Sequence, residues 1–188
     1  MNVYDWDKTI YKNDSTVDFF FWQIRRHPSL LRYLPVQLWG FIGYFLRIHD
    51  KTKMKSFFYR YLAGVKDTEK EVEEFWDSHI NNIHEWYRDK HRDDDLVISA
   101  SADYLVRPAL RRLNVQRLIA SEVDPVTGKV LSKNCNGTEK VVRFDKAGYK
   151  REDIEEFYSD SLGDTPMAEI SPKSYLVAGE KLTEWPHK

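Results

Sequence analysis

The chain has 188 residues, of which 41% are hydrophobic, and its formal net charge is −1. A chain of this length can bury one core together with an insertion, and its near-zero charge argues against general nucleic-acid binding. The single cysteine, Cys135, cannot form an internal disulfide and offers no metal cluster, which indicates a reducing compartment. Met1 lies almost at the first predicted strand, which leaves no room for a secretory signal peptide. We therefore expect a cytoplasmic protein.

The first predicted strand ends in two carboxylates, Asp5 and Asp7, within the string Asp-Trp-Asp-Lys-Thr. Side chains two positions apart in an extended chain lie on the same face, so these carboxylates should converge on one point. In a parallel sheet that point lies at the crevice where ligands bind. Converging like charges repel each other unless a cation, a proton or a reacting electrophile is present. A solvated turn or a helix cap is the plain structural alternative.

Three further features follow along the chain. A short apolar run ends at Ser99 and leads into a predicted helix start at residues 100–103. A polar turn then precedes a helical segment that carries Lys140 in its first turn, where a lysine opposes the helix macrodipole and needs a local anion. Finally, a predicted strand ends at Asp160, and a turn carries Asp164.

Each of these features also has a structural interpretation. Ser99 could cap a helix, Lys140 could be a solvated surface amine, and Asp160 and Asp164 could form turns. Taken together, however, the hydroxyl, the amine and both carboxylate pairs fall where strands or loops deliver residues to one edge of a sheet. This is the set of groups needed for Mg²⁺-assisted phosphoryl transfer through an aspartyl intermediate.

The motifs at residues 5–9, 97–99, 140 and 160–164 resemble the four ordered motifs of the haloacid dehalogenase superfamily. The residues of these motifs most resemble the subfamily that contains phosphoserine phosphatase, and bacterial phosphatidylglycerophosphate phosphatase is a further near relative. The resemblance implies an α/β fold, with a Rossmann-like parallel sheet and an inserted α-helical cap. Lys8 departs from the pattern, since many relatives carry glycine there, and it adds a positive charge beside the site.

The resemblance also implies a phosphatase that acts on a small-molecule phosphomonoester. At the matching positions Asp5 would attack phosphorus, and Asp7 would protonate the leaving group and then deprotonate water. Ser99 and Lys140 would neutralise the phosphoryl oxygens. Displacement of halide would not need Asp7 as an acid, so a dehalogenase is disfavoured. A module that binds phosphate or membrane without catalysis would not need both carboxylates of the first pair.

A Mg²⁺ cofactor follows from the same resemblance. Its ligands would be Asp5, the backbone carbonyl of Asp7, and Asp160, with water and a substrate oxygen completing an octahedron. Asp164 would support this set by orienting a metal-bound water or by restraining Lys140.

The spacing of the motifs predicts a helical insertion, because about ninety residues separate the first motif from Ser99. We assign residues 1–11 and 92–188 to the catalytic core and residues 12–91 to the cap. Within the cap, the pattern predicts helices over residues 17–26, from Pro35 to about residue 48, and from about residue 50 to 64. A further amphipathic helix is predicted after residue 68 and extends through Trp86.

Charge is concentrated in the cap. Residues 16–66 contain nine Lys and Arg against two Asp and Glu, a net charge of +7, together with nine Phe and Trp. One interpretation is a packed cap with a solvated basic face. The alternative is a peripheral contact with anionic lipid at the inner face of the membrane, with Lys51, Lys53 and Lys55 facing the head groups. That alternative would suit a lipid phosphatase of the phosphatidylglycerophosphate type. Residues 33–46 are uncharged but too few to cross a bilayer.

Overall fold

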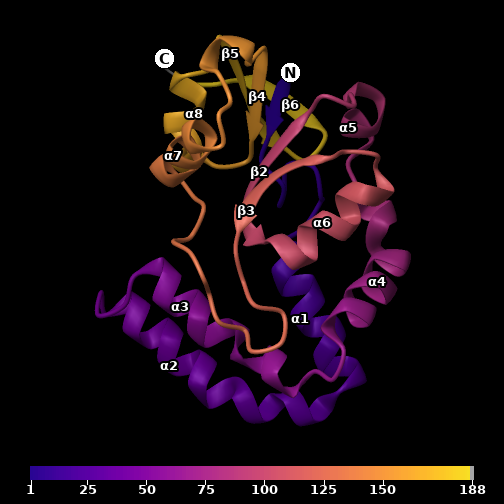
Figure 1. Ribbon diagram of the computed structural model, residues 1–188, viewed down its shortest axis with the longest axis vertical. Coiled ribbons are helices and arrows are strands. Elements are labelled where there is room, and N and C mark those ends of the chain that lie inside the picture. The colour runs from indigo at the N-terminus through magenta and orange to yellow at the C-terminus, as the bar shows by residue number, and fades with distance from the viewer. Residues whose placement is uncertain (187–188) are drawn as a thin grey trace.

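The computed structural model describes residues 1–186, in which one six-stranded sheet carries helices on both faces (Figure 1). The strands lie in the order β3-β2-β1-β4-β5-β6, and all neighbours are parallel except β5 and β6. Their bounds are β1 Asn2–Tyr4, β2 Leu96–Ala102, β3 Arg117–Ser121, β4 Glu156–Ser159, β5 Lys173–Ala178 and β6 Lys181–Glu184. The predicted α/β fold with a mostly parallel, Rossmann-like sheet is confirmed.

Successive side chains along each strand point to opposite faces of the sheet, so the core has one part on each face. Tyr4 and Tyr158 stack on one face, with ring centroids 4.8 Å apart, whereas Val3 and Phe157 belong to the core on the other face. Both faces are buried, as expected for a parallel sheet covered by crossover helices. The helices C-terminal to β2 are α6 Asp103–Arg112 on the tyrosine face, and α7 Thr138–Lys146 and α8 Thr165–Glu169 on the opposite face.

The segment between β1 and β2 is helical, as predicted. Aspartates cap three of its helices, since the side chains of Asp14, Asp50 and Asp67 accept backbone N–H groups in the first turns. The bounds are α1 Ser15–Arg26, α2 Leu34–Phe45, α3 Lys51–Phe58, α4 Thr68–His79 and α5 Glu85–Lys90, with 3₁₀ turns over Pro28–Tyr33, Tyr59–Gly64 and Ile80–Asn82.

Some of these helices pack into the core beside the sheet, and others lie away from it. The rings of Trp6 and Trp76 lie edge to face at 5.7 Å, and the Trp76 indole donates to the Leu105 carbonyl at 2.7 Å. These contacts join α4 and α6 to the loop after β1 in one core. Figure 1 shows α2 and α3 as a pair well away from the sheet. The division into a core of residues 1–11 and 92–188 and a cap of residues 12–91 remains our proposal.

The amphipathic helix predicted after residue 68 does not continue through Trp86, so this prediction was wrong. It ends at His79, and α5 begins separately at Glu85. Between them the backbone pairs with the loop after β1: Lys12 N–H donates to the Asn82 carbonyl at 2.8 Å, and His84 N–H donates to the Ile10 carbonyl at 2.9 Å. These bonds satisfy peptide groups that a continuous helix would use internally.

Two other predicted boundaries also shift. The strand containing Ser99 runs on to Ala102, which caps α6, so Ser99 is not the helix cap. The helix from Pro35 ends at Phe45, because Arg47 takes a left-handed conformation with φ +59°. The N–H groups of residues 48 and 49 then both donate to the Gly43 carbonyl, which closes the helix end.

Candidate active site

The polar motifs meet at the centre of the sheet. β1 lies between β2 and β4, so the crossovers run in opposite directions on its two sides, and such a switch point forms a ligand crevice at the carboxyl ends of the strands. Asp5 directly follows β1, and Asp160 directly follows β4. A pocket of about 370 Å³ lies there. Its polar lining includes Asp5, Asp7, Lys8, Asp14, Lys51, Lys55, Ser101, Lys140, Asp160 and Asp164.

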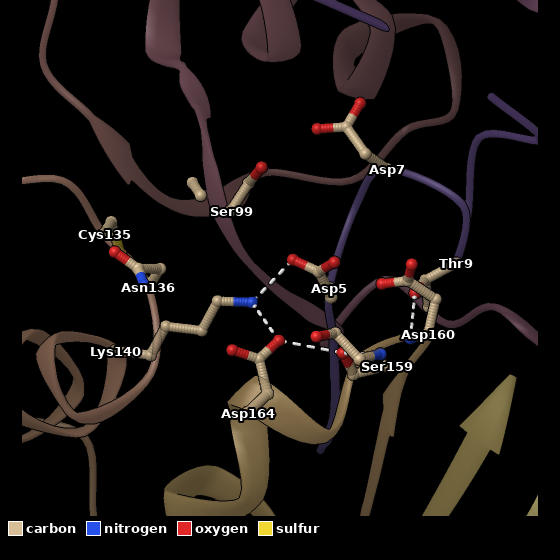
Figure 2. A network of polar contacts seen from close by, with 12 residues as sticks. Asp5, Asp7, Thr9, Ser99, Cys135, Asn136, Lys140, Ser159, Asp160 and Asp164 are labelled. Carbon is tan, nitrogen blue, oxygen red and sulfur yellow. Dashed lines mark hydrogen bonds and ion pairs between the residues drawn. The ribbon is translucent and has the colours of Figure 1, made fainter. Parts of the chain in front are cut away.

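Lys140 is the electrostatic centre of this site (Figure 2). Its side chain is only 2% exposed, and its Nζ donates to Asp5 Oδ1 at 2.6 Å and to Asp164 Oδ2 at 2.7 Å. Burial by itself would lower the pKa of Lys140, but the two carboxylates outweigh it and raise that pKa above its usual value. The local anion expected for a lysine in a first helical turn is therefore present twice, and the interpretation of Lys140 as a solvated surface amine was wrong.

Asp164 ties the loop after β4 to the start of α7. One of its carboxylate oxygens accepts from Lys140 and from Ser159 Oγ, at 2.8 Å from the latter. The other accepts the Gly137 N–H at 3.3 Å. Gly137 caps α7 with φ +56°, a conformation that favours glycine. Asp164 therefore contacts both the side chain of Lys140 and the backbone that precedes α7.

Several neighbouring groups shift the pKa of Asp5. Burial raises the pKa of Asp5 to about 7, Lys140 opposes this shift, and the negative charges of Asp164 and Asp7 add to it. The residue is fixed in place because its N–H donates to the Tyr158 carbonyl at 2.8 Å. Lys140 is thus shared by Asp5 and Asp164, and the pocket as a whole is lined by five carboxylates and four lysines.

Asp7 is held from both sides of the pocket. Its Oδ1 accepts the N–H and the hydroxyl of Ser15, at 2.7 and 2.6 Å, and its Oδ2 accepts the hydroxyl of Ser101. Trp6 donates to Ser15 Oγ at 3.1 Å, which leaves the Ser15 proton directed at Asp7. Burial and the negative charge of Asp14 raise the pKa of Asp7 to about 6, despite these hydrogen bonds. A carboxyl with a raised pKa is suited to exchanging protons near neutral pH.

Ser99 is not among the residues that line this pocket. It is fully buried, and its Oγ accepts the Ser101 N–H at 3.0 Å. Ala100 and Ser101 form the adjacent pocket wall. Ser15 and Ser101 were not predicted as site residues, because single serines at a helix start and a strand end carry no distinctive pattern.

Asp160 lines the pocket opposite Lys140. Its N–H donates to Thr9 Oγ1 at 2.9 Å, so the threonine of the first motif joins the loops after β1 and β4. Burial raises the pKa of Asp160, and the nearby Lys8 opposes the shift. Lys8 itself has φ +57°, in the left-handed region that favours glycine. The backbone here therefore explains why a glycine would suit this position.

Lys55 is a pocket residue that the sequence did not reveal as one. It lies on α3, and its Nζ reaches across to the sheet and donates to the Ala100 carbonyl at 2.6 Å. Burial lowers the pKa of Lys55 to about 8. The expectation that Lys55 faces lipid head groups was therefore wrong, because its side chain points into the pocket. Only packing of α3 against the strand ends could have shown this.

The Rossmann-like sheet thus carries a pocket lined by carboxylates and lysines at its switch point, an arrangement typical of α/β enzymes. The model of the haloacid dehalogenase-like hydrolase family matches residues 3–169. The chain therefore belongs to this family and is a hydrolase.

Solved structures share the fold at low sequence identity. A protein of unknown function from Bordetella pertussis Tohama I is 22% identical, with a TM-score of 0.74 over 93% of this chain and 87% of that one. A phosphoserine phosphohydrolase-like protein from Francisella tularensis is 17% identical, with a TM-score of 0.56 over 93% and 86%. A phosphoserine phosphatase in apo form is 15% identical, with a TM-score of 0.50 over 92% and 82%. The comparison with curated proteins found no match.

Proposed function

We propose that the protein is a Mg²⁺-dependent phosphatase that hydrolyses a small phosphomonoester through an aspartyl phosphate on Asp5. One observation carries the proposal: the buried Lys140 bridges Asp5 and Asp164 inside a pocket that Asp7 and Asp160 also line. The fold likeness to phosphoserine phosphatase agrees with this chemistry.

The residues present fit a hard divalent cation. Among residues 1–186 no three His, Cys, Asp or Glu side chains converge as a site built from side chains alone requires. The proposed set needs only two carboxylates, of Asp5 and Asp160, with the Asp7 backbone carbonyl. All three are oxygen donors, which Mg²⁺ prefers. Asp5 shares the ammonium of Lys140 with Asp164, so a second cation beside Asp5 would be stabilised, and Mg²⁺ bound there would neutralise a phosphoryl oxygen.

The chemistry of the protein groups divides between the first two carboxylates. An Asp5 oxygen attacks phosphorus, and the bond from phosphorus to the leaving-group oxygen breaks. Asp7 donates its proton to that oxygen, and its raised pKa favours this step. In the second step the ionised Asp7 takes a proton from water, which attacks phosphorus and releases Asp5. Lys140 and Ser99 neutralise the phosphoryl oxygens, where charge is spread in the transition state.

Two substitutions should separate metal binding from catalysis. We expect Asp160→Ala to raise the Mg²⁺ concentration for half-maximal activity roughly tenfold or more, because a direct ligand is lost. Ser99→Ala should leave that concentration unchanged and lower kcat at saturating Mg²⁺ by about 10²-fold. Each variant serves as the control for the other. A metal titration of Asp160→Ala that overlays the wild type would show that the ligand assignment is wrong.

The outer part of the pocket selects the leaving group. Lys51 and Lys55 supply positive charge there, and Val17, Phe41, Met54 and Phe58 supply apolar surface. This lining suits a substrate that carries a second anionic group and an apolar portion. A screen of phosphomonoesters with Mg²⁺, including phosphoserine, sugar phosphates and phosphatidylglycerophosphate, tests the proposal. Release of phosphate from none of them would count against phosphatase activity and in favour of a non-catalytic module.

Lys55→Met should weaken binding of the preferred substrate. We expect KM to rise about tenfold with little change in kcat, because one charge contact is lost at the leaving group. In the wild type, Lys55 loses its charge as pH rises through about 8, so KM should rise there. That rise should disappear in Lys55→Met. Lys53→Met, an exposed change on the same helix, is the matched control. Equal effects of both variants would remove Lys55 from the substrate site.

The lipid-phosphatase alternative has one specific observation in its favour. Phe41 on α2 lines the pocket and is 37% exposed, so apolar surface lies at the pocket mouth. Among residues 1–186 there is no helix with the length and apolar character needed to cross a membrane. Any contact with lipid would therefore be peripheral, at the inner face of the membrane for a cytoplasmic protein.

A further inference from the structure

Helix α2 has an inverted distribution of polar and apolar side chains. Its buried residues are Gln37, Gly40 and Gly43, which are polar or small, while its large apolar residues point outward. A helix of a water-soluble domain has the opposite arrangement, with the large apolar side chains facing the core.

The side of α2 that faces the protein carries small residues because α3 and the turn before it lie very close. A Cβ at Gly40 would come within 2.5 Å of Phe57 Cβ, and one at Gly43 within 2.2 Å of His49 Cδ2. Gln37 satisfies its amide by donating to the Phe58 carbonyl at 2.9 Å. Close packing through small residues is typical of helix pairs whose outer surfaces face lipid.

The outward side carries several exposed apolar side chains, which together we call the outer face. Phe45 is 80% exposed, and Leu46 and Ile48 are each 64% exposed. Single exposed apolar residues are ordinary, but a cluster of this size marks a contact surface. The outer face comprises Leu38, Trp39, Ile42, Tyr44, Phe45, Leu46 and Ile48.

The charges near the outer face are mostly positive, with Asp50 as the exception. No Asp or Glu occurs between Asp18 and Asp50, whereas Arg47, Lys51 and Lys53 follow the end of α2. These cations complement the phosphates of an anionic bilayer. A second copy of the chain docked through the same face would bring like charges together, which disfavours self-association as the reason for this surface.

The length of α2 limits how it could contact a bilayer. Its 12 residues span about 18 Å, which is well short of the roughly 30 Å hydrocarbon core. The helix can therefore lie only along the surface, with its apolar side chains inserted below the head groups. Figure 1 shows that α2 and α3 lie at the end of the molecule away from the sheet, where they are free to make this contact.

We propose that the outer face docks the protein on an anionic lipid bilayer. Arg47 and Lys53 lie at the head groups, and Phe45, Leu46 and Ile48 insert into the acyl boundary. Phe41, which lies on the same helix, lines the pocket, so docking brings the pocket mouth close to the membrane surface. The docking does not depend on the proposed phosphatase chemistry.

Vesicle co-sedimentation of the full chain tests this proposal. We expect binding to vesicles of phosphatidylcholine with roughly one-third phosphatidylglycerol, and weaker binding when salt is raised, since the Debye length shortens. A Phe45→Ser, Leu46→Ser double variant should lower the partition coefficient at least about tenfold, because two side chains no longer enter the apolar phase. Arg47→Glu with Lys53→Glu should lower it only on the anionic vesicles.

Val142→Ser is the matched control, because Val142 is 56% exposed on α7, away from α2 (Figure 1). It should leave the partition coefficient unchanged. Three results would overturn the proposal: no association at low ionic strength, equal binding by the Phe45→Ser, Leu46→Ser variant, or a solution dimer that this variant converts to monomer. Thermal unfolding confirms that each variant is folded. Turnover of a soluble phosphomonoester is measured separately, so failure of docking and failure of the phosphatase proposal are distinguishable.

Discussion

Asp5→Asn is expected to abolish turnover while leaving the protein folded. The change is nearly isosteric, but an amide cannot act as the nucleophile that forms the aspartyl phosphate. Loss of an obligatory covalent nucleophile should lower kcat by about 10⁴-fold or more. The amide oxygen can still accept from Lys140, so the melting temperature should change little. Steady-state phosphate release and thermal unfolding measure the two effects.

Asp67→Asn is the matched control for Asp5→Asn. Asp67 does not line the pocket, and its side chain accepts the Lys70 N–H at 3.1 Å as the cap of α4. Asparagine caps helices about as well as aspartate, so activity should stay within a few-fold of the wild type. Residual activity of Asp5→Asn within tenfold of the wild type would rule out Asp5 as the nucleophile.

Lys140→Met should damage both catalysis and stability. Removing Lys140 deletes a charge that neutralises phosphoryl oxygens and leaves Asp5 and Asp164 facing each other without their cation. Breaking a buried ion pair in this way typically costs about 3–5 kcal/mol of unfolding free energy. Denaturant unfolding without Mg²⁺ measures the loss. Lys133→Met is the control, because the Lys133 side chain is 71% exposed and the change should cost less than about 0.5 kcal/mol.

The destabilisation by Lys140→Met should depend on pH in a defined direction. The folded-state pKa of Asp5 is already about 7, above its ordinary value of 3.8, so the folded chain binds more protons than the unfolded chain between these values. The free energy of unfolding therefore falls as pH rises through this range. Loss of Lys140 raises that pKa further. The variant should consequently lose more stability at pH 8 than at pH 5, and a pH-independent loss would contradict the assigned pairing.

The sequence predicted the sheet, the helical insertion and the residues at the strand ends. Asp5, Asp7, Asp160 and Asp164 could be placed together because the carboxyl ends of parallel strands meet at one edge. The need of Lys140 for a local anion followed from its position in a first helical turn. The spacing of these residues can be read from their order, whereas the parallel sheet was implied by the resemblance to the haloacid dehalogenase superfamily.

Other features depend on contacts between distant segments. The break after His79 arises because the following backbone pairs with residues 10–12, and this long-range pairing cannot be read from the local sequence. The position of Lys55 in the pocket depends on how α3 meets the end of β2. Similarly, the inverted polarity of α2 depends on which of its faces meets α3. An apolar composition alone is equally consistent with a buried helix.

The most direct test of the central claim is to trap the phosphoryl group on Asp5. In Asp7→Asn, p-nitrophenyl phosphate should still phosphorylate the enzyme, since its leaving group needs no proton, whereas hydrolysis of the intermediate should slow. A rapid acid quench followed by peptide mass spectrometry should then find phosphate on the N-terminal peptide at Asp5, with a burst of about one equivalent of nitrophenolate. Continued nitrophenolate release with no phosphate on Asp5, or with phosphate on another residue, would contradict the account.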